Sequence, residues 1–311
     1  MNEIVLVGSL AYDRIMQFSG SFGDHFLPEK LHQLSVGFLI DTVTQEFGGT
    51  AGNITYNLSL LGLSADCVAS LGKDRQSYEE HLHAHSISTD TIATNDELLT
   101  AGAYIMSDMH NNQITSFAPG AGGLPYAEKI DLSERKAVLV SPTNIEDMNS
   151  FVKLSAEASV PCFFDPGQQI PAFSKESLQE AISLSNALFV NDYELALVLQ
   201  KTGWTEADIL ERVSFLVVTL GSKGARIQTK EETVHVPAVQ AEAVDPTGAG
   251  DAFRAGFLAG YIKGLSNETC ARIGATLAAY AVESHGGQHH APSKEALAER
   301  FTASYGEAWP L

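Results

Sequence analysis

Basic residues are scarce in this chain of 311 residues: 19 lysines and arginines stand against 38 aspartates and glutamates, giving a formal net charge of -19 at pH 7. So negative a chain is unsuited to nucleic acid or to an anionic membrane surface, and we expect neither as a partner. The same field would repel a small polyanion. Such a ligand would need local donors, namely backbone N–H groups, a helix N-terminus and a divalent cation.

Cysteines and long apolar runs are also few. The three cysteines, Cys67, Cys162 and Cys270, are odd in number, widely spaced and flanked by apolar residues, which is typical of reduced core thiols rather than of disulfides or a metal site. The start of the chain has no basic segment, and its first apolar run, Ile4–Val7, is far too short for a signal peptide or a membrane span. We therefore expect a soluble, cytoplasmic protein.

No internal repeat and no low-complexity or proline-rich run is visible. Hydrophobic residues make up 44% of the chain and charged residues 18%, a balance that favours a folded globular protein over a disordered one. The length exceeds that of a usual single domain without reaching two, which predicts one large core with a smaller appendage.

Short apolar runs recur along the chain and indicate buried parallel strands. Segments with helical spacing lie between them, each ended by a glycine, as at Gly62 and Gly203. This alternation predicts an α/β fold with a doubly wound, mainly parallel sheet flanked by helices. The expected strands are Ile4–Val7, Ala137–Val140, Pro161–Phe164, Ala187–Val190 and Phe215–Thr219.

Two regions, 12–46 and 98–123, interrupt the alternation. In the second, Thr100–Ser107 and Gln113–Ala118 indicate strands around a turn. We expect both regions to form a small β-sheet lid over the carboxyl ends of the main strands, where open α/β sheets bind ligands. The main domain would then comprise 1–11, 47–97 and 124–311. Exposed lid strands could pair between subunits, which predicts a homodimer through the lid.

The most informative stretch is the glycine-rich turn Asp245–Phe253, which opens a helix. Small residues at Gly248, Ala249 and Gly250 let several N–H groups and the positive helix end converge on one anion. Asp251 could accept the proton of an attacking hydroxyl while these amides meet the charge on a transferred phosphoryl group. A carboxylate at a helix start is expected to have a lowered pKa. The alternative is a tight capping loop without chemistry.

Two common nucleotide motifs are absent. The chain has no G-x-x-x-x-G-K-[ST] pattern, and its first strand is followed by Gly8-Ser9-Leu10 rather than by a dinucleotide fingerprint. These absences disfavour P-loop kinases and dehydrogenases.

The glycine-rich turn closely resembles the second signature of the ribokinase-like (PfkB) carbohydrate kinase family, and Phe47–Asn53 resembles its first, acceptor-binding signature. The likeness covers nearly the whole chain. Within the family, the chain looks most like bacterial adenosine and nucleoside kinases. The segments that carry this likeness are Gly8–Asp13, Phe26–Glu29, Asn191–Glu194, Lys201–Trp204 and Asp251–Gly256.

The resemblance implies an acceptor site at Asp13, Gly48, Gly49 and Asn53, whose carboxylate and amide could bridge vicinal ribose hydroxyls. Asp13 as a solvated loop residue and Asn53 as a helix cap are the alternatives, and the two glycines could form only a turn.

A nucleoside base needs an aromatic face and amides at its edge. Phe117 on the second lid strand, with Gln168 and Gln169 after a strand-end turn, would supply them, although Phe117 could instead pack within the lid. Adenosine-specific relatives tend to carry a second aromatic residue in the lid. Here Ala103 occupies that position and Tyr104 should point the other way, which weakens the prediction of strict adenine selectivity.

The resemblance also implies an ATP site. Asn191 and Glu194 match the family's N-x-x-E element, with Glu194 reaching Mg²⁺ through water, although the pair could equally form a capping box. Further implied ATP-binding residues are Thr219, Gly221, Gly224 and Thr247. Asp245 and Thr247 could bind a monovalent cation such as K⁺, with Ser284, Gly286 and His290 as partners.

Several histidines lie outside these motifs. His81 and His85 share a helix face from which His83 points away, so we interpret the three as a solvated helix face rather than a metal site. The same interpretation applies to His289-His290 and to the acidic residues at 79 and 80.

The sequence thus predicts a Mg·ATP-dependent nucleoside kinase, adenosine kinase-like, that phosphorylates the ribose 5′-hydroxyl with Asp251 as the base. A ribose or fructose kinase would share Asp13, Asn53 and Asp251 without needing a stacking surface. A non-catalytic nucleoside-binding protein is the alternative from another class.

Overall fold

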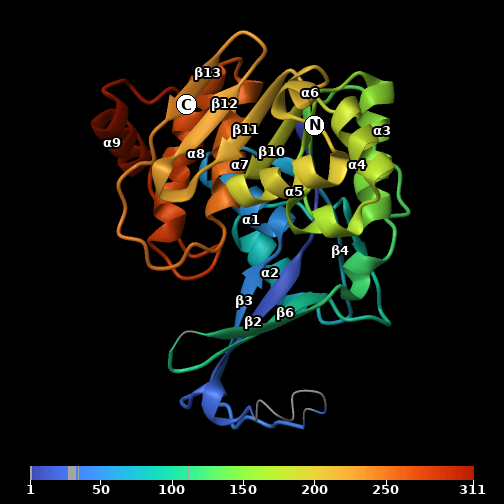
Figure 1. The fold of residues 1–311 in the computed structure, drawn as a ribbon, viewed down its shortest axis with the longest axis vertical. Coiled ribbons are helices and arrows are strands. Elements are labelled where there is room, and N and C mark those ends of the chain that lie inside the picture. Colours follow the sequence, from blue (N-terminus) through green and yellow to red (C-terminus); the bar gives the residue numbers. More distant parts are fainter. Residues whose placement is uncertain (1, 27–32, 34, 111) are drawn as a thin grey trace.

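A computed structural model describes residues 2–26, 33, 35–110 and 112–311. Its main sheet has nine strands in the order β13-β12-β11-β10-β9-β8-β1-β4-β5 (Figure 1). All neighbours from β11 to β5 run parallel, whereas β12 and β13 are antiparallel. The strands are β1 Ile4–Val7, β4 Ala65–Leu71, β5 Ile92–Thr94, β8 Ala137–Val140, β9 Cys162–Phe164, β10 Ala187–Asn191, β11 Phe215–Thr219, β12 Ala225–Gln228 and β13 Thr233–Val236.

The prediction of an α/β fold with a mainly parallel sheet is confirmed, and the five apolar runs are β1, β8, β9, β10 and β11. The apolar pattern did not reveal β4, whose interior contains Asp66 and Ser70, the edge strands β5 and β13, or β12 beside β13. Edge strands are covered on fewer sides, so their sequences carry less continuous apolar signal.

Helices cover both faces of the sheet because the strand residues alternate between two cores. Ile4 and Leu6 face one core and Val5 and Val7 the other. The first core receives α1 Thr50–Leu60, α2 Gln76–Ala84, α7 Ala249–Ile262, α8 Asn267–Val282 and α9 Lys294–Tyr305. The second receives α3 Ile145–Ala158, α4 Lys175–Leu184, α5 Asp192–Thr202 and α6 Glu206–Leu210.

The second sheet has four strands in the order β3-β2-β6-β7 and projects from one end of the main body (Figure 1). Its strands are β2 Ala11–Gln17, β3 Thr42–Gly48, β6 Ala101–Ser107 and β7 Gln113–Ala118. The antiparallel pair β6 and β7 forms the expected hairpin. We refer to these four strands as the lid sheet. Of the segment Phe26–Glu29, only Phe26 lies within the described residues.

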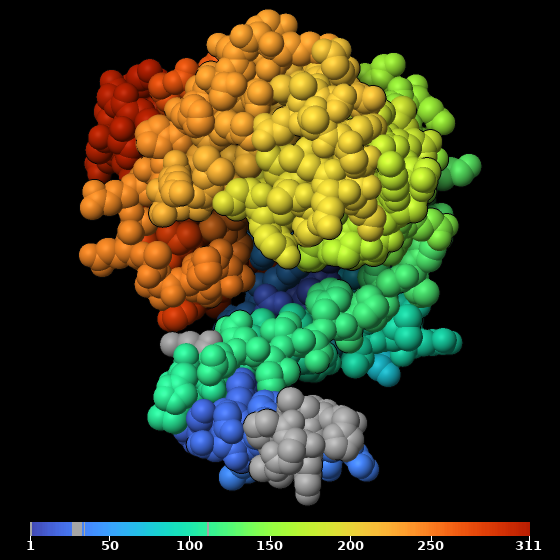
Figure 2. Space-filling view, in the orientation of Figure 1, coloured from blue at the N-terminus to red at the C-terminus, as the bar shows by residue number. Residues whose placement is uncertain are grey.

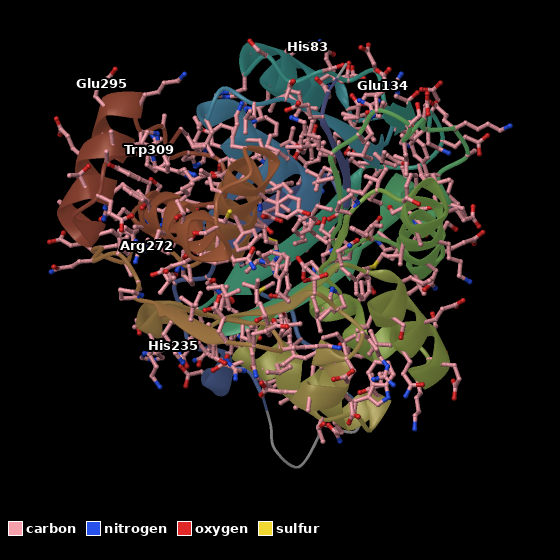
Figure 3. The ribbon with its side chains drawn as sticks, turned by 90° about the horizontal axis from the view of Figure 1, so that it is seen from above. His83, Glu134, His235, Arg272, Glu295 and Trp309 are labelled. Carbon is pink, nitrogen blue, oxygen red and sulfur yellow. The ribbon has the colours of Figure 1, made fainter. Side chains whose placement is uncertain are left out.

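The three cysteines and the end of the chain belong to the packed body. Cys67, Cys162 and Cys270 are free and buried, as predicted. The chain after α9 packs back on the body, where Trp309 meets Phe301 and Arg272 pairs with Glu307 (Figure 3). Among the described helices, none is long and apolar enough to cross a membrane.

The helices α7 and α8 cross at glycines. A Cβ at Gly256 would lie 2.7 Å from the Cα of Gly274, and a Cβ at Gly274 would lie 2.5 Å from the carbonyl oxygen of Phe253. Both contacts involve backbone, which cannot rotate away as a side chain can. The crossing therefore fixes the axis of α7, the helix whose N-terminus carries the glycine-rich turn.

We predict that Gly256→Ala and Gly274→Ala each lower the free energy of unfolding by about 1–3 kcal/mol, because the added methyl overpacks the crossing. This is the net change, because the clash with backbone atoms outweighs the roughly 1 kcal/mol that alanine contributes to helix stability. Urea denaturation measures the effect. Gly37→Ala is the control, since it adds a methyl at an exposed site with nothing within 4 Å. Unchanged or increased stability of both helix variants would contradict the account.

Candidate functional site

A cavity of about 730 Å³ lies at the carboxyl ends of the main strands, between the sheet and the lid. Figure 2 shows the hollow between the lid and the helices above it. Residues that follow β1, β8, β9, β10 and β11 line it together with the start of α7, as expected for parallel strands whose carboxyl ends meet at one edge. From these strand ends come Ser9, Pro142, Asp165, Gly167, Gln168, Asn191, Asp192, Glu194, Thr219 and Gly221.

The glycine-rich turn forms one wall of the cavity. Gly248 caps α7 with a φ of 77°, and a Cβ there would lie 2.7 Å from Gly287, so glycine is required on both counts. The N–H groups of Gly248 and Gly250 have no hydrogen-bond partner among the described residues. The N–H of Ala249, which we expected to be free, instead donates to the carbonyl of Pro246 at 3.2 Å.

Asp251 lies in this wall and is held by Asn53. The side-chain Nδ2 of Asn53 donates to Oδ2 of Asp251 at 2.8 Å, which leaves Oδ1 of Asp251 without a partner in the described part of the chain. Asn53 is inside α1, whose N-cap is Gly49. The alternative interpretation of Asn53 as a helix cap is therefore wrong.

A chain of hydrogen bonds continues from Asn53 to the surface. Gln288 Nε2 donates to Asn53 Oδ1 at 3.0 Å, and its Oε1 lies 2.8 Å from His81 Nε2. Because each amide must turn its oxygen toward the preceding donor, His81 Nε2 has to carry the proton. Every donor in the chain then points toward the carboxylate of Asp251, so Gln288 and His81 orient Asn53.

The interpretation of the helix histidines as solvated is wrong for two of the three. His81 stacks on Phe47 with ring centroids 4.0 Å apart, and His85 meets Tyr56 edge-on. His83 does lie at the periphery of the molecule (Figure 3). His290, given the same interpretation, is buried. No group of three metal-binding side chains occurs among the described residues.

Burial dominates the electrostatics of Asp251. It raises the pKa of this carboxyl to about 6, although Arg254 and the hydrogen bond from Asn53 favour the ionised form. The expectation of a lowered pKa was wrong, because removal from water outweighs the helix terminus. The pKa of Asp13 is also raised to about 6, chiefly by burial and then by the negative charges of Asp251 and Glu46.

The lid contributes the opposite wall. Asp13, Ala103 and Phe117 are cross-strand neighbours in β2, β6 and β7 and all line the cavity. Phe117 is 55% exposed, so it is not consumed by packing within the lid. Tyr104 points away, as predicted, and receives a hydrogen bond from Arg14.

The two glycines expected at the acceptor site differ in role. Gly49 lines the cavity and adopts a φ of 85° as the N-cap of α1. Gly48 is buried outside the cavity wall, and a Cβ there would collide with Oδ2 of Asp13. Its contribution is the space it leaves for that carboxylate. Gln168 lines the cavity, whereas Gln169 does not.

The expected ATP-binding residues mostly converge on the same cavity. Asn191 and Glu194 form the capping box of α5, with Glu194 Oε2 accepting from the Asn191 N–H at 2.8 Å, and both also line the cavity with Thr219, Gly221 and Thr247. Gly224 is not in the wall. Its φ is 91°, and a side chain there would collide with the Val236 carbonyl oxygen, so this glycine serves the turn before β12.

Hydrogen bonds to the Asp245 side chain hold the surrounding loop in place. The Asp245 carboxylate accepts the N–H groups of Thr247 and Gly286, both at 2.9 Å. His290, named as a partner for a cation there, instead turns its Nε2 to Asn57 at 2.7 Å. His290 is therefore wrongly placed for such a site.

Two cavity residues received no role from the sequence. Asp165 and Arg254 form a buried ion pair, with Arg254 Nε 2.5 Å from Asp165 Oδ2. Arg254 lies three residues after Asp251 and so on the same helix face, a spacing that was visible in the sequence. Gln288 was missed as well, and no sequence pattern connected it to Asn53.

Comparisons with known proteins agree on one family. Residues 1–294 match the model described as pfkB family carbohydrate kinase. A nucleoside kinase of Methanocaldococcus jannaschii is 34% identical over 304 residues, which cover 97% of this chain and 97% of that protein.

Solved structures give the same picture. Nucleoside kinase from Burkholderia thailandensis in complex with inosine superimposes with a TM-score of 0.85 at 37% identity, covering 98% of this chain and 99% of that one. The same enzyme has been solved with ADP-inosine, at a TM-score of 0.83 and 38% identity. Ribokinase from Arabidopsis thaliana, solved with ribose and ATP, shares the fold with a TM-score of 0.79 at 21% identity.

The raised pKa of Asp251 makes a prediction about stability. Its folded pKa of about 6 exceeds the ordinary value of 3.8, so the ionised carboxylate opposes folding at every pH above about 6. Asp251→Asn should therefore raise Tm at pH 8 by about 2–5 °C. The gain should shrink as the pH falls through 6 toward 4, where the wild-type carboxyl becomes neutral.

Thermal unfolding at pH 8, 6 and 4.5 measures this difference. Asp245→Asn is the matched control of opposite sign, because N–H groups that donate to Asp245 lower its pKa and its ionised form stabilises the fold. A lower Tm for Asp251→Asn at pH 8 would contradict the assigned cause.

Proposed function

The chain belongs to the pfkB family of carbohydrate kinases, and from this premise we propose that it transfers the γ-phosphoryl group of ATP to the ribose 5′-hydroxyl of a purine nucleoside. It is a nucleoside kinase by its full-length relatives. The observation that carries the mechanism is the position of Asp251, beside free amides at the start of α7 and across one cavity from Asp13 and Phe117.

Asp251 would act as the base. Asn53 occupies Oδ2, and Oδ1 is free to accept the 5′-hydroxyl and later its proton. With its pKa raised to about 6, the carboxylate is ionised at neutral pH yet more basic than an exposed aspartate. In a loose phosphoryl-transfer transition state the proton can move late, so orienting the hydroxyl is the larger part of this role.

The amides of Gly248 and Gly250, with the positive end of α7, would meet the negative charge of the phosphoryl group during transfer. Ala249 would contribute its small side chain rather than its N–H, which is already bonded. Because these donors are fixed before ATP binds, they need no reorganisation at the moment of reaction.

The acceptor would lie between lid and sheet. Asp13, Gly49 and Asn53 would hold the ribose hydroxyls. One Nδ2 hydrogen of Asn53 already goes to Asp251, so Asn53 would donate its second Nδ2 hydrogen, and its Oδ1 keeps one lone pair besides the bond from Gln288. Phe117 would stack on the base, and Gln168, with Gln169 behind it, would face the base edge. The small Ala103 beside Phe117 favours purine nucleosides in general, adenosine and inosine among them.

Asn191, Glu194, Thr219, Gly221 and Thr247 would surround the ATP phosphates, with Gly224 shaping the adjoining turn. The oxygen atoms of Glu194 and Asp192 suit Mg²⁺, which would neutralise phosphate charge when bound. Since the described residues hold no cluster of three metal ligands, phosphate oxygens and water would supply most of its shell. A K⁺ site would have to use Asp245 and Thr247 without His290.

We further propose that residues 12–46 and 98–123 move as a lid on the main domain of 1–11, 47–97 and 124–311. Closure would exclude water, which otherwise competes with the acceptor for ATP.

A coupled ATPase assay with adenosine, inosine, guanosine, cytidine, ribose and fructose tests the function. We expect turnover with purine nucleosides and little with the free sugars. Asp251→Asn should lower kcat by ~10²–10⁴-fold, as for a positioned base, and Phe117→Ala should raise the nucleoside KM while leaving any activity on ribose unchanged. Preference for ribose or fructose would identify a sugar kinase, and no turnover at all would favour a binding protein.

A homodimer through the lid is supported by apolar side chains exposed there, Val43 at 65%, Met109 at 59% and Ile114 at 40%. We predict a solution mass of about twice 33.3 kDa by light scattering. Val43→Lys with Ile114→Lys should halve it, since two charges would enter the interface. Leu184→Lys, a similar change on α4, should not. A monomeric wild-type protein would rule the dimer out.

A further inference from the structure

The cavity has an unusual balance of charge. Five carboxylates line it, Asp13, Asp165, Asp192, Glu194 and Asp251, and Arg254 is the single cation among its described lining residues. The chain as a whole adds a net charge of -19. A nucleotide polyanion must nevertheless enter this space, so one fixed positive charge inside it matters more than in a basic site.

Arg254 is held where a ligand could reach it. Its side chain is only 10% exposed, and it makes no hydrogen bond to any described residue, although its Nε lies 2.5 Å from Asp165 Oδ2. Nε and Asp165 Oδ1 are fully buried and form no hydrogen bond. Neither Nη atom donates a hydrogen bond to a described residue, and Arg254 lines the cavity. The guanidinium thus presents free donors to the space in front of α7.

Asp165 explains how an arginine stays there. Its carboxylate is 2% exposed, and a charge so deeply buried is retained only with a partner. The pair also leaves hydrogen-bonding capacity unused on both sides. A purely structural ion pair would be expected to satisfy more of it, so the unused donors indicate a missing ligand.

Gly250, beside Arg254, leaves space for the guanidinium. A Cβ at Gly250 would lie 2.6 Å from Nη1 of Arg254, although the backbone there does not require glycine by its φ. The absence of a side chain lets the guanidinium lie against the first turn of α7, beside the free N–H of Gly250.

We propose that Arg254 is a catalytic residue whose Nη groups bind the phosphoryl group in transfer, beside the amides of Gly248 and Gly250, with Asp165 as its positioning residue. This rests on the proposed kinase function. As the bond from the acceptor oxygen to Pγ forms and the bond from Pγ to the bridging oxygen of ADP breaks, the hydroxyl proton passes to Asp251. Arg254 exchanges no proton and stabilises charge on the equatorial oxygens.

The test begins with Arg254→Ala and the nucleoside that the wild-type enzyme uses. We expect kcat to fall by ~10²–10⁴-fold, in the range of arginines that contact a transferring phosphoryl group, with the nucleoside KM within about 3-fold of wild type. Guanidinium ion at non-denaturing millimolar concentration should raise the kcat of Arg254→Ala at least about tenfold, because the ion fills the vacated space with the same hydrogen-bond donors. It should not rescue Asp251→Asn.

Arg135→Gln is the matched control. Arg135 is equally buried, with a side chain 8% exposed, and is paired with Asp66 at 2.5 Å, but it lies at the amino ends of the strands. Its removal should cost stability and leave kcat unchanged. If Arg254→Ala retained kcat within about 3-fold of Arg135→Gln, the proposal would be wrong.

A double variant, Arg254→Met with Asp165→Leu, separates catalysis from folding. Replacing a buried pair by apolar residues is often neutral or stabilising, so a structural role predicts that activity returns once the protein is folded. The proposal predicts that kcat stays low in a fold confirmed by circular dichroism. If the wild-type enzyme phosphorylates no nucleoside, the proposed function fails first, independently of Arg254.

Discussion

The hydrogen bond between Asn53 and Asp251 joins two helices that are 198 residues apart in sequence, and the arrangement of the cavity depends on it. α1 follows the lid strand β3, whereas α7 follows the glycine-rich turn, and only their packing on the same face of the sheet brings the two side chains together. Tight glycine contacts between α7 and α8 and at Gly248 keep that packing fixed. Without this geometry, the buried carboxylate would lose the side-chain hydrogen bond that orients it.

The negative charge of the chain and of its cavity limits how the protein could bind phosphate groups. For the proposed reaction, an acidic chain with an acidic cavity would rely on donors that do not depend on net charge: backbone amides, a helix end and one buried guanidinium. Each of these is fixed by the fold, so under this proposal strong binding would require a ligand whose phosphates reach all three at once. The surrounding carboxylates would repel anions that engage only one of these donors, so the charges that weaken phosphate binding would also increase its selectivity.

The sequence was sufficient to predict structural elements that depend on a local pattern of one residue type. Continuous apolar runs located β1, β8, β9, β10 and β11, and the glycine-rich turn located the start of α7, because parallel central strands and tight turns have strict local requirements. It was insufficient where tertiary burial decides. The helix position of Asp251 suggests a low pKa, yet removal from water reverses the direction.

Long-range partners were equally hidden from the sequence. Gln288 contacts Asn53 across 235 residues, and nothing in the neighbourhood of either residue indicates the other. Gly224 matched a motif for phosphate binding but is explained by the turn it occupies. His81 has the composition of a surface histidine and becomes part of an aromatic cluster only because β3 lies against α2.

The lid and the body are joined at one point by a very short connection. β3 ends at Gly48 and α1 begins at Thr50, so a single residue, Gly49, separates this strand of the lid sheet from the helix that carries Asn53. The lid sheet and the helix that carries the Asn53 amide are therefore joined without a linker. In the proposed closure, a tilt of β3 would therefore pass directly into α1 and, through the hydrogen bond from Asn53, change the orientation of the Asp251 carboxylate.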